Sequence, residues 1–391
     1  MHRQVPVALL ATLCVLATLP AGSVAAPGTP SGATVEQPAD HDSPPVVAGA
    51  AGTGTDASAN DTGASANGTN PPADPESDVI GWENGRWHNE SIDVNASDGI
   101  DRAESARLLN RSIARVELLR GVEFTEPVDL NFRNRSEVAS LFTADNVSNP
   151  DAVNAYYEAL GLVGEDRDAV EVYREKQAGG AAAFVVPRPV PQLDLQAGDV
   201  TVVLDEGQAA YPETHLAHEL VHTLQVQQLE FPFARTPGAA DSFNARRGVV
   251  EGEASHVGYR YQRRCAADWD CVLPESTESS DLSTAATGLL FLDIVRYSAG
   301  GEFVAQLQDD GGWDAVTDVY DRLPASTEQV IHPDRYPGDT PQNVTVPDSS
   351  GDAWQPVSAA ADTVGESGLF TMLWYPSVAN GDSVVMPQRA A

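Results

Sequence analysis

Lysine is nearly absent from this chain of 391 residues, and positive charge of any kind is scarce. Lys176 is the single lysine, and 23 lysines and arginines stand against 57 aspartates and glutamates, which gives a formal net charge of −34. A chain this acidic lacks the cationic surface that displaces counterions from phosphates, so nucleic acid is excluded as a partner. At about 1 M salt the Debye length falls to about 3 Å and self-repulsion is largely screened. The composition therefore indicates a halophile's protein, adapted to concentrated salt.

An acidic disordered tail is the alternative source of such a charge. Acidic residues are spread along the whole chain, however, and 42% of the residues are hydrophobic, which is enough for a sizeable core. We therefore expect a folded acidic protein.

Long apolar runs are also missing, except at the N-terminus, where one extends from Val5 to Leu19. Small residues follow it, with Val24 and Ala26 at the minus-three and minus-one positions of a cleavage site. The pattern predicts a secretory signal peptide over residues 1–26, because the run is too short and too weakly flanked for a stable membrane span. No later segment reaches the roughly eighteen consecutive apolar residues of a transmembrane helix. We expect a protein without a transmembrane segment after cleavage, secreted or held at the cell surface.

Cysteine is equally scarce, with three in the chain, of which Cys14 lies in the predicted signal peptide. Export would leave Cys265 and Cys271, separated by five residues, in an oxidising compartment. A local disulfide is the favoured interpretation. Half of a metal site is the alternative, and the lack of any further cysteine in the mature chain weighs against it.

Residues 27–79 contain little besides Gly, Ala, Thr, Ser, Pro, Asn and Asp, without hydrophobic periodicity. Such a segment cannot bury enough apolar area to offset its ordering entropy, so we expect a disordered linker. Seven of the eight N-x-Ser/Thr sequons precede residue 150, which suggests a glycosylated linker and outer face. The sequons begin at Asn60, Asn67, Asn89, Asn95, Asn110, Asn134, Asn146 and Asn343.

The remaining residues, 80–391, have the aromatic and leucine content of a globular domain, which we divide into an N-terminal lobe (80–210) and a helical lobe (211–375). Short apolar, β-branched runs predict adjacent strands at 183–186 and 200–204. Periodic apolar positions predict helices at 103–119, 151–162, 211–230, 241–263, 284–297, 302–308 and 313–322. The expected fold is α+β, a small sheet followed by a mostly helical C-terminal half.

The predicted helix at 211–230 contains the sequence His218-Glu219-Leu220-Val221-His222. Positions i and i+4 share one face of a helix, so the two imidazoles can bind one Zn²⁺ while Glu219 projects beside the open coordination position. A surface histidine cluster is the alternative. It is less favoured here, because the motif lies on an amphipathic helix that follows a strand in an exported protein.

Catalytic zinc needs a third protein ligand. In one class of zinc site the motif continues as His-x-x-Gly-x-x-His, which would place Gly at position 225 and a third His at position 228. This chain has Gln225 and Gln228 there, which excludes that class. A carboxylate from a second helix is the other solution, and the segment Gly248-Val-Val-Glu-Gly-Glu-Ala254 offers Glu251 and Glu253. These two point about 200° apart around a helix, so only one of them can face the metal.

These motifs resemble the gluzincin metallopeptidases, whose third ligand is commonly the first Glu of a Glu-Gly-x-Ala segment. The chain is most similar to a group of exported haloarchaeal surface proteins classed as metalloproteases. The resemblance covers about residues 100–375 and includes further blocks, namely Tyr297-Ser-Ala-Gly-Gly-Glu-Phe-Val304, Gly311-Gly-Trp-Asp-Ala-Val316, Ser326-Thr-Glu-Gln-Val-Ile-His-Pro333 and Gly365-Glu-Ser-Gly-Leu369.

The resemblance implies a zincin-like fold, a peptide or protein substrate, and a zinc ion bound by His218, His222 and Glu251. It makes Glu219 the catalytic carboxylate. This agrees with the chemistry, since zinc lowers the pKa of a water to about 7 and polarises the scissile carbonyl. Glu219 would act as general base and later deliver the proton to the leaving amine.

Gluzincins usually stabilise the oxyanion with a downstream His, Tyr or Arg. The candidates for this role are His332, Tyr336 and Tyr297. We name His332 as the catalytic residue, because it is the only histidine after the predicted helix at 241–263, whereas packing or capping is the favoured interpretation of each tyrosine. His215 could orient a ligand or bond to nearby backbone. We expect a structural role for His256.

An exported, salt-adapted zinc metallopeptidase is the leading hypothesis. The alternative is a non-catalytic cell-surface binding or structural protein that retains a zincin fold. A purely structural metal is less favoured, because a structural zinc site requires a fourth protein ligand and would give Glu219 no role.

Overall fold

The structure is a computed structural model. It describes residues 14–17, 73–139, 149–204, 211–229, 240–273, 284–345, 347, 351, 353 and 362–379. The predicted signal peptide and linker lie outside these residues except at 14–17 and 73–79, and so do the sequons at Asn60, Asn67 and Asn146. The described part is α+β and mostly helical, which confirms the expected class.

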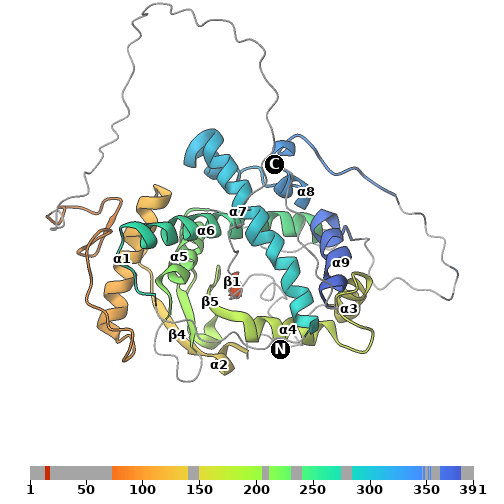
Figure 1. Cartoon of the computed structure of the whole chain (residues 1–391), viewed down its shortest axis with the longest axis horizontal. Helices are drawn as coiled ribbons and strands as arrows, with labels where there is room; N and C mark the ends of the chain where they lie inside the picture. The colour runs from red at the N-terminus through yellow and green to blue at the C-terminus, as the bar shows by residue number, and fades with distance from the viewer. Residues whose placement is uncertain are drawn as a thin grey trace, which may run out of the picture. The chain divides into compact units, whose positions relative to one another are not determined.

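Four strands form the main sheet in the order β1-β5-β6-β4 (Figure 1). The strands expected at 183–186 and 200–204 are its central pair, β5 (Ala181–Val185) and β6 (Val200–Leu204), which run antiparallel with Val185 opposite Val200. On the other side of β6 lies the parallel strand β4 (Leu130–Asn134). A separate hairpin pairs β2 (Trp82–Glu83) with β3 (Arg86–Trp87).

Both faces of the sheet are covered, because side chains alternate between them along each strand. Val185, Val200 and Val202 belong to the main hydrophobic core with helices α1 and α5. Phe184 and Val203 point to the opposite face and pack in a second cluster. Apolar side chains therefore pack against both faces of the sheet, and the face with Val185 and Val200 shares its core with α5.

Strand β1 (Cys14–Ala17) comes from the segment predicted to be a signal peptide. It pairs antiparallel with β5, with Cys14 opposite Val185, at one edge of the sheet. Removal of residues 1–26 would therefore take away this strand and leave β5 at the edge. The cleavage itself remains a prediction.

The first long helix, α1 (Arg102–Arg120), corresponds to the one expected at 103–119. Asp101 and Glu104 form a capping box at its N-terminus, and Gly121, with φ of 77°, ends it in the left-handed conformation. Helix α3 (Pro150–Ala159) corresponds to the one expected at 151–162. The sequence did not predict α2 (Arg135–Ala139), α4 (Ala169–Gly180), the strand β4 or the β2–β3 hairpin.

Helices α5 (Glu213–Gln228) and α6 (Ala240–Ala267) lie near the ranges expected for them. The helices expected at 284–297 and 302–308 form one continuous helix within α7 (Thr284–Asp318). Non-helical backbone at Gly311 and Gly312 separates it from the last part of α7, where the helix expected at 313–322 begins. The prediction of a break near residue 300 was wrong, because glycines there pack against α6. Short helices α8 (Thr327–Ile331) and α9 (Gly365–Ala379) follow, together with 3₁₀ turns at Pro191–Leu193 and Pro333–Arg335.

Glycines bring α6 and α7 into backbone contact. A Cβ atom added to Gly252 would lie 2.3 Å from the carbonyl carbon of Gly300, and one added to Gly300 would lie 2.0 Å from the carbonyl oxygen of Gly248. Real Cβ atoms do not approach backbone so closely. The blocks Gly248–Ala254 and Tyr297–Val304 therefore meet as the two sides of one helix crossing.

One disulfide and one buried ion pair link parts of the fold. Cys265 and Cys271 form a disulfide at the end of α6, which confirms the expected pairing. Lys176 on α4 forms an ion pair with Asp293 on α7, and its side chain is only 6% exposed. Burial lowers the pKa of this lysine, and Asp293 counteracts that effect.

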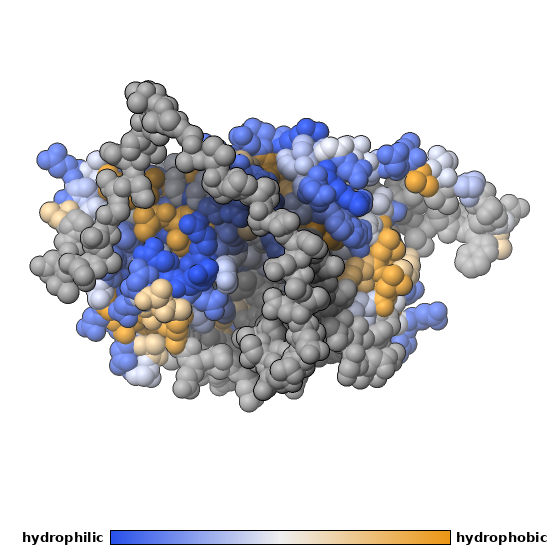
Figure 2. Space-filling model, turned by 45° about the horizontal axis from the view of Figure 1, so that its top comes forward, coloured by the Kyte–Doolittle hydropathy of each residue, from blue (hydrophilic) through white to orange (hydrophobic). Residues whose placement is uncertain are grey.

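On the face drawn in Figure 2, hydrophilic residues surround several smaller groups of apolar residues. Within the part of the chain that the structure describes, none of the helices combines the length and apolar composition needed to cross a membrane.

The carboxyl groups of Glu117 and Glu123 meet beside the β2–β3 hairpin. Glu117 of α1 is fully buried, and it accepts hydrogen bonds from the backbone of Gly81 and Phe124, at 3.2 Å each. Burial and a hydrogen bond to the side chain of Glu123 raise the pKa of Glu117 to about 9. Burial, Asp78 and Glu123 also raise the pKa of Glu83 to about 7. The native state therefore holds protons that the unfolded chain releases above pH 4.5.

The Glu123→Gln substitution should flatten the pH dependence of stability. A raised native pKa stabilises the fold fully below about pH 4.5, and this contribution is lost as the pH rises toward 9. Removing the charge of Glu123 lowers the pKa of Glu117. For each pKa unit by which it falls, the free energy of unfolding that the protein loses at high pH becomes smaller by about 1.4 kcal/mol. Denaturant unfolding at pH 6, 7.5 and 9 measures how the free energy of unfolding depends on pH. The control is Glu126→Gln, the same change at an exposed position. Equal pH dependence in both variants would contradict the shared proton.

Candidate metal centre

Helix α5 carries the two histidines of the motif, His218 and His222, and packs its apolar residues in the core. Pro212, with extended backbone, precedes its first turn, and Leu216, Leu220 and Leu224 lie in the main hydrophobic cluster. The same helix leaves His218 and His222 one turn apart on a shared face. Core packing therefore fixes the direction in which the histidines point.

The start of α5 is anchored by the buried side chain of Glu213. Its carboxylate accepts from Arg111 at 2.9 Å, from Arg115 at 2.7 Å and from the hydroxyl of Tyr261. The backbone of Val272, next to the disulfide, both donates to this carboxylate and accepts from the backbone nitrogen of Glu213. The first turn of α5 is thus tied to α1, to α6 and to the disulfide loop.

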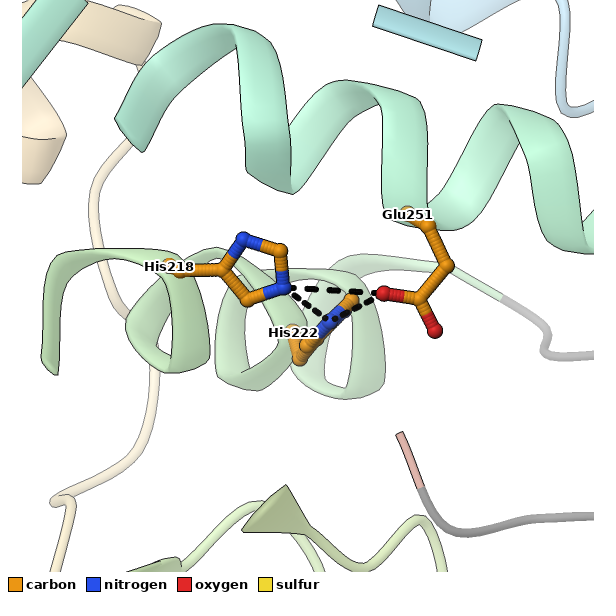
Figure 3. A group of neighbouring side chains, drawn as sticks. All are labelled: His218, His222 and Glu251. Carbon is orange, nitrogen blue, oxygen red and sulfur yellow. Dashed lines mark hydrogen bonds and ion pairs between the residues drawn. The ribbon is translucent and has the colours of Figure 1, made fainter. Parts of the chain in front are cut away.

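Glu251 of α6 faces the two histidines of α5 (Figure 3). The Nε2 atoms of His218 and His222 are 3.2 Å apart, and Oε2 of Glu251 is 3.5 and 3.3 Å from them. All three side chains are buried, with exposed fractions of 5%, 1% and 0%. This group could hold a metal ion.

Arg247 holds the carboxylate of Glu251 from behind. It lies one turn earlier on α6 and donates to Oε1 of Glu251 at 2.5 Å, which leaves Oε2 facing the histidines. Burial alone would raise the pKa of Glu251, but Arg247 and the two histidines hold it well below its usual range. Burial also lowers the pKa of His218, although its contact with Glu251 counteracts this. Metals bind carboxylates in the ionised form and imidazoles in the neutral form, so the low pKa of Glu251 and the lowered pKa of His218 both favour metal binding.

Glu219 lies between the two histidines in the sequence and is fully buried. Within the described part of the chain, neither of its carboxylate oxygens has a hydrogen-bond partner. Burial raises its pKa to about 8, with His222 opposing and Glu251 reinforcing this shift. A buried carboxylate without a partner is costly, so its retention beside a metal-binding group is typical of a functional role.

Glu253, the competing carboxylate, points away from the histidines. It forms an ion pair with Arg120 of α1 and accepts from Gln225 and Tyr320. The structure thus brings together His218, His222 and Glu251, the three residues named as ligands from the sequence.

His332 is placed at the end of α8, where its Nε2 lies 2.9 Å from Glu366 of α9. Tyr336 donates to the backbone of Arg322 and packs against Phe303, as expected of a packing residue. The residue that lies beside the group is Tyr297 of α7, whose ring centre is 6.1 Å from that of His218. Of the three candidates named for the oxyanion, Tyr297 is therefore the one placed beside a ligand histidine.

The two other histidines near the motif differ in their surroundings. Burial and the neighbouring His218 lower the pKa of His215 to about 4, so its ring is neutral. His256 lies 2.7 Å from the side-chain amide of Gln308 and packs against Trp313, which fits the expected structural role.

Sequence reasoning missed two residues that contact the ligands. Arg247 precedes Glu251 by four positions, and Gln225 follows His222 by three positions, with its Oε1 atom 2.8 Å from Nδ1 of that ring. Helical spacing from each ligand could have identified both, since positions three or four apart share a face.

No protein-family model, no curated protein and no solved structure matches the chain, so the description of this centre rests on its sequence motif and its geometry.

Proposed function

We propose that the chain is a zinc-dependent metallopeptidase of the gluzincin type, exported and adapted to concentrated salt. One observation carries the proposal: two imidazole nitrogens and one carboxylate oxygen converge from two helices beside the buried, unpartnered carboxylate of Glu219. The zincin-like fold belongs to the same proposal.

The ligand set and its spacing both fit zinc. Two histidines and one carboxylate form a known catalytic zinc site with an open fourth position. Bonds of about 2.0 to 2.1 Å at tetrahedral angles put neighbouring ligand atoms about 3.3 Å apart. The three separations here are 3.2, 3.3 and 3.5 Å. The set therefore needs almost no rearrangement to take a tetrahedral ion.

A bound zinc ion would supply a Lewis acid that polarises a carbonyl and lowers the pKa of a water molecule. Glu219 would take the proton of that water and pass it to the leaving amine. Burial raises the proton affinity of Glu219, and the positive charge of a bound zinc ion would favour the ionised form that accepts the proton. Arg247 would keep Glu251 aimed at the ion through the peptide-cleavage cycle.

Tyr297 is the first candidate for stabilising the oxyanion in this proposal. Its ring lies beside His218, whereas the imidazole of His332 lies within hydrogen-bonding distance of Glu366. A tyrosine hydroxyl can donate a hydrogen bond to the negative charge that develops on the carbonyl oxygen.

Metal content and peptide cleavage, measured on protein purified at high salt, test the proposal. We expect one zinc per chain and cleavage that is lost with a chelator and restored by zinc. Because an acidic surface attracts stray divalent ions, His222→Ala should lose the zinc while His256→Ala, a histidine outside the group, keeps it.

The other outcomes separate the hypotheses. Zinc without cleavage of a broad peptide library would support the alternative, a cell-surface binding protein. Wild-type protein without zinc would overturn the metal site.

A further inference from the structure

We infer that Gln225 is a positioning residue that fixes the tautomer of His222, so that Nε2 of this histidine presents its lone pair to the metal site. The inference rests on the proposed metal centre but requires no peptidase activity. It also assigns a task to Glu253, the second glutamate of the Glu-Gly-Glu-Ala segment.

The side chain of Gln225 is buried and makes contacts at both ends. Its oxygen, Oε1, lies 2.8 Å from Nδ1 of His222. Its nitrogen, Nε2, donates to the backbone oxygen of Val250 at 3.0 Å, to Glu253 at 2.8 Å and to the hydroxyl of Tyr320 at 2.9 Å.

The partners of Gln225 determine which way its amide points. A backbone carbonyl can only accept hydrogen bonds, and the carboxylate of Glu253 already accepts from Arg120 and from the hydroxyl of Tyr320. If the amide were reversed, its oxygen would face the oxygens of Val250 and Glu253, with no proton between them. The NH₂ group therefore faces these acceptors, and the amide oxygen faces His222.

This orientation settles the proton of His222. An amide oxygen can only accept, so the Nδ1 atom beside it must carry the hydrogen. A neutral imidazole has one N–H, which leaves a lone pair on Nε2. That atom is the one lying 3.2 Å from Nε2 of His218 and 3.3 Å from Oε2 of Glu251. The hydrogen-bond partner of one ring nitrogen thus prepares the other to bind a metal.

The residues that hold Glu253 in place come from segments other than α5 and α6. Arg120 comes from the last turn of α1, where its guanidinium also donates to Thr317 at 3.0 Å and lies 4.6 Å from the ring centre of Trp313. Tyr320 follows α7 directly. Glu253 therefore connects the orientation of a ligand on α5 to the packing of α1 and α7.

The tautomer of His222 can be read directly from wild-type protein. Metal-free full-length chain labelled with ¹⁵N-histidine is examined by long-range ¹H–¹⁵N NMR, and the His222 signals are assigned by their loss in His222→Asn. We expect the proton on Nδ1. A neutral ring with its proton on Nε2 would overturn the inference without any variant of Gln225.

Gln225→Met removes the amide while keeping a side chain of similar length. Its zinc affinity, measured by competition with a chromophoric chelator, should fall about 10- to 100-fold, the usual effect of losing a partner that orients a ligand. The control is Gln228→Met, the same change at an exposed position of α5. The His222 ring of the Gln225 variant should also populate the Nε2–H form.

The outcomes distinguish this inference from the proposed function. Unchanged zinc affinity in a folded Gln225→Met protein would overturn the positioning role, even if the wild type cleaves peptides. A wild type that binds zinc, shows the Nδ1–H tautomer and loses affinity with Gln225→Met, yet cleaves no peptide, would contradict the peptidase proposal alone.

Discussion

Glu219→Gln is expected to lower peptide cleavage about 100- to 10,000-fold, the usual contribution of a general base. The amide keeps the size of the carboxylate but cannot take a proton from water. The substitution should leave the fold intact, because neither oxygen of Glu219 has a partner to lose in the described part of the chain, and burial already disfavours its charge. Zinc content should stay at one per chain, because the three ligand side chains are untouched.

The matched control is Glu158→Gln, the same chemical change on the exposed surface of α3, which should leave cleavage unchanged. Initial rates on one peptide, with metal content measured on the same samples, make the comparison. If the Glu219 variant retained full activity with bound zinc, another group would have to act as the base.

Gly300→Ala is expected to destabilise the fold by about 3 kcal/mol, the upper end for an overpacked interior. Its methyl group would lie 2.0 Å from the backbone oxygen of Gly248, and a backbone atom cannot move aside as a flexible side chain can. Helices α6 and α7 would have to separate. Glu251 lies between Gly248 and Gly252 in the sequence of α6, so a shift of this helix should also weaken zinc binding.

Gly301→Ala is the control for this prediction, because the added methyl group would meet nothing closer than 3.9 Å. Alanine is favoured over glycine inside a helix by about 0.5 to 1 kcal/mol, so this neighbour should be slightly more stable than wild type. Denaturant unfolding at one salt concentration compares the two. Equal stability of both variants would show that the helices are not held at the observed distance.

The two histidine ligands could be predicted from the sequence because their spacing is a local pattern. His218 and His222 are one turn apart, and the apolar residues between them predict a helix with one face in the core. Glu251 is different: helical geometry left Glu253 as an alternative, and only the resemblance to gluzincins favoured Glu251. The structure separates the two because Arg120, on a helix more than 130 residues earlier, pairs with Glu253.

The rest depends on tertiary contacts that no local pattern contains. The run from Tyr297 to Gly301 predicts a helix end, since glycine disfavours helix interiors, yet the crossing with α6 needs glycine there and keeps α7 continuous. Gln225 entered the prediction only as a residue that ruled out one class of zinc site. Its partners outside α5 lie on two other segments, α6 and the residues after α7, so the orientation of its amide could not be inferred from the sequence.

The buried ion pair of Lys176 with Asp293 has a practical consequence for labelling. Lys176 is the only lysine in the chain, and its amine is enclosed between α4 and α7. The folded protein therefore presents no accessible side-chain amine to acylating reagents. Its one reactive amine is the α-amino group of the first residue, so a label attached there marks the N-terminus that the cell produces.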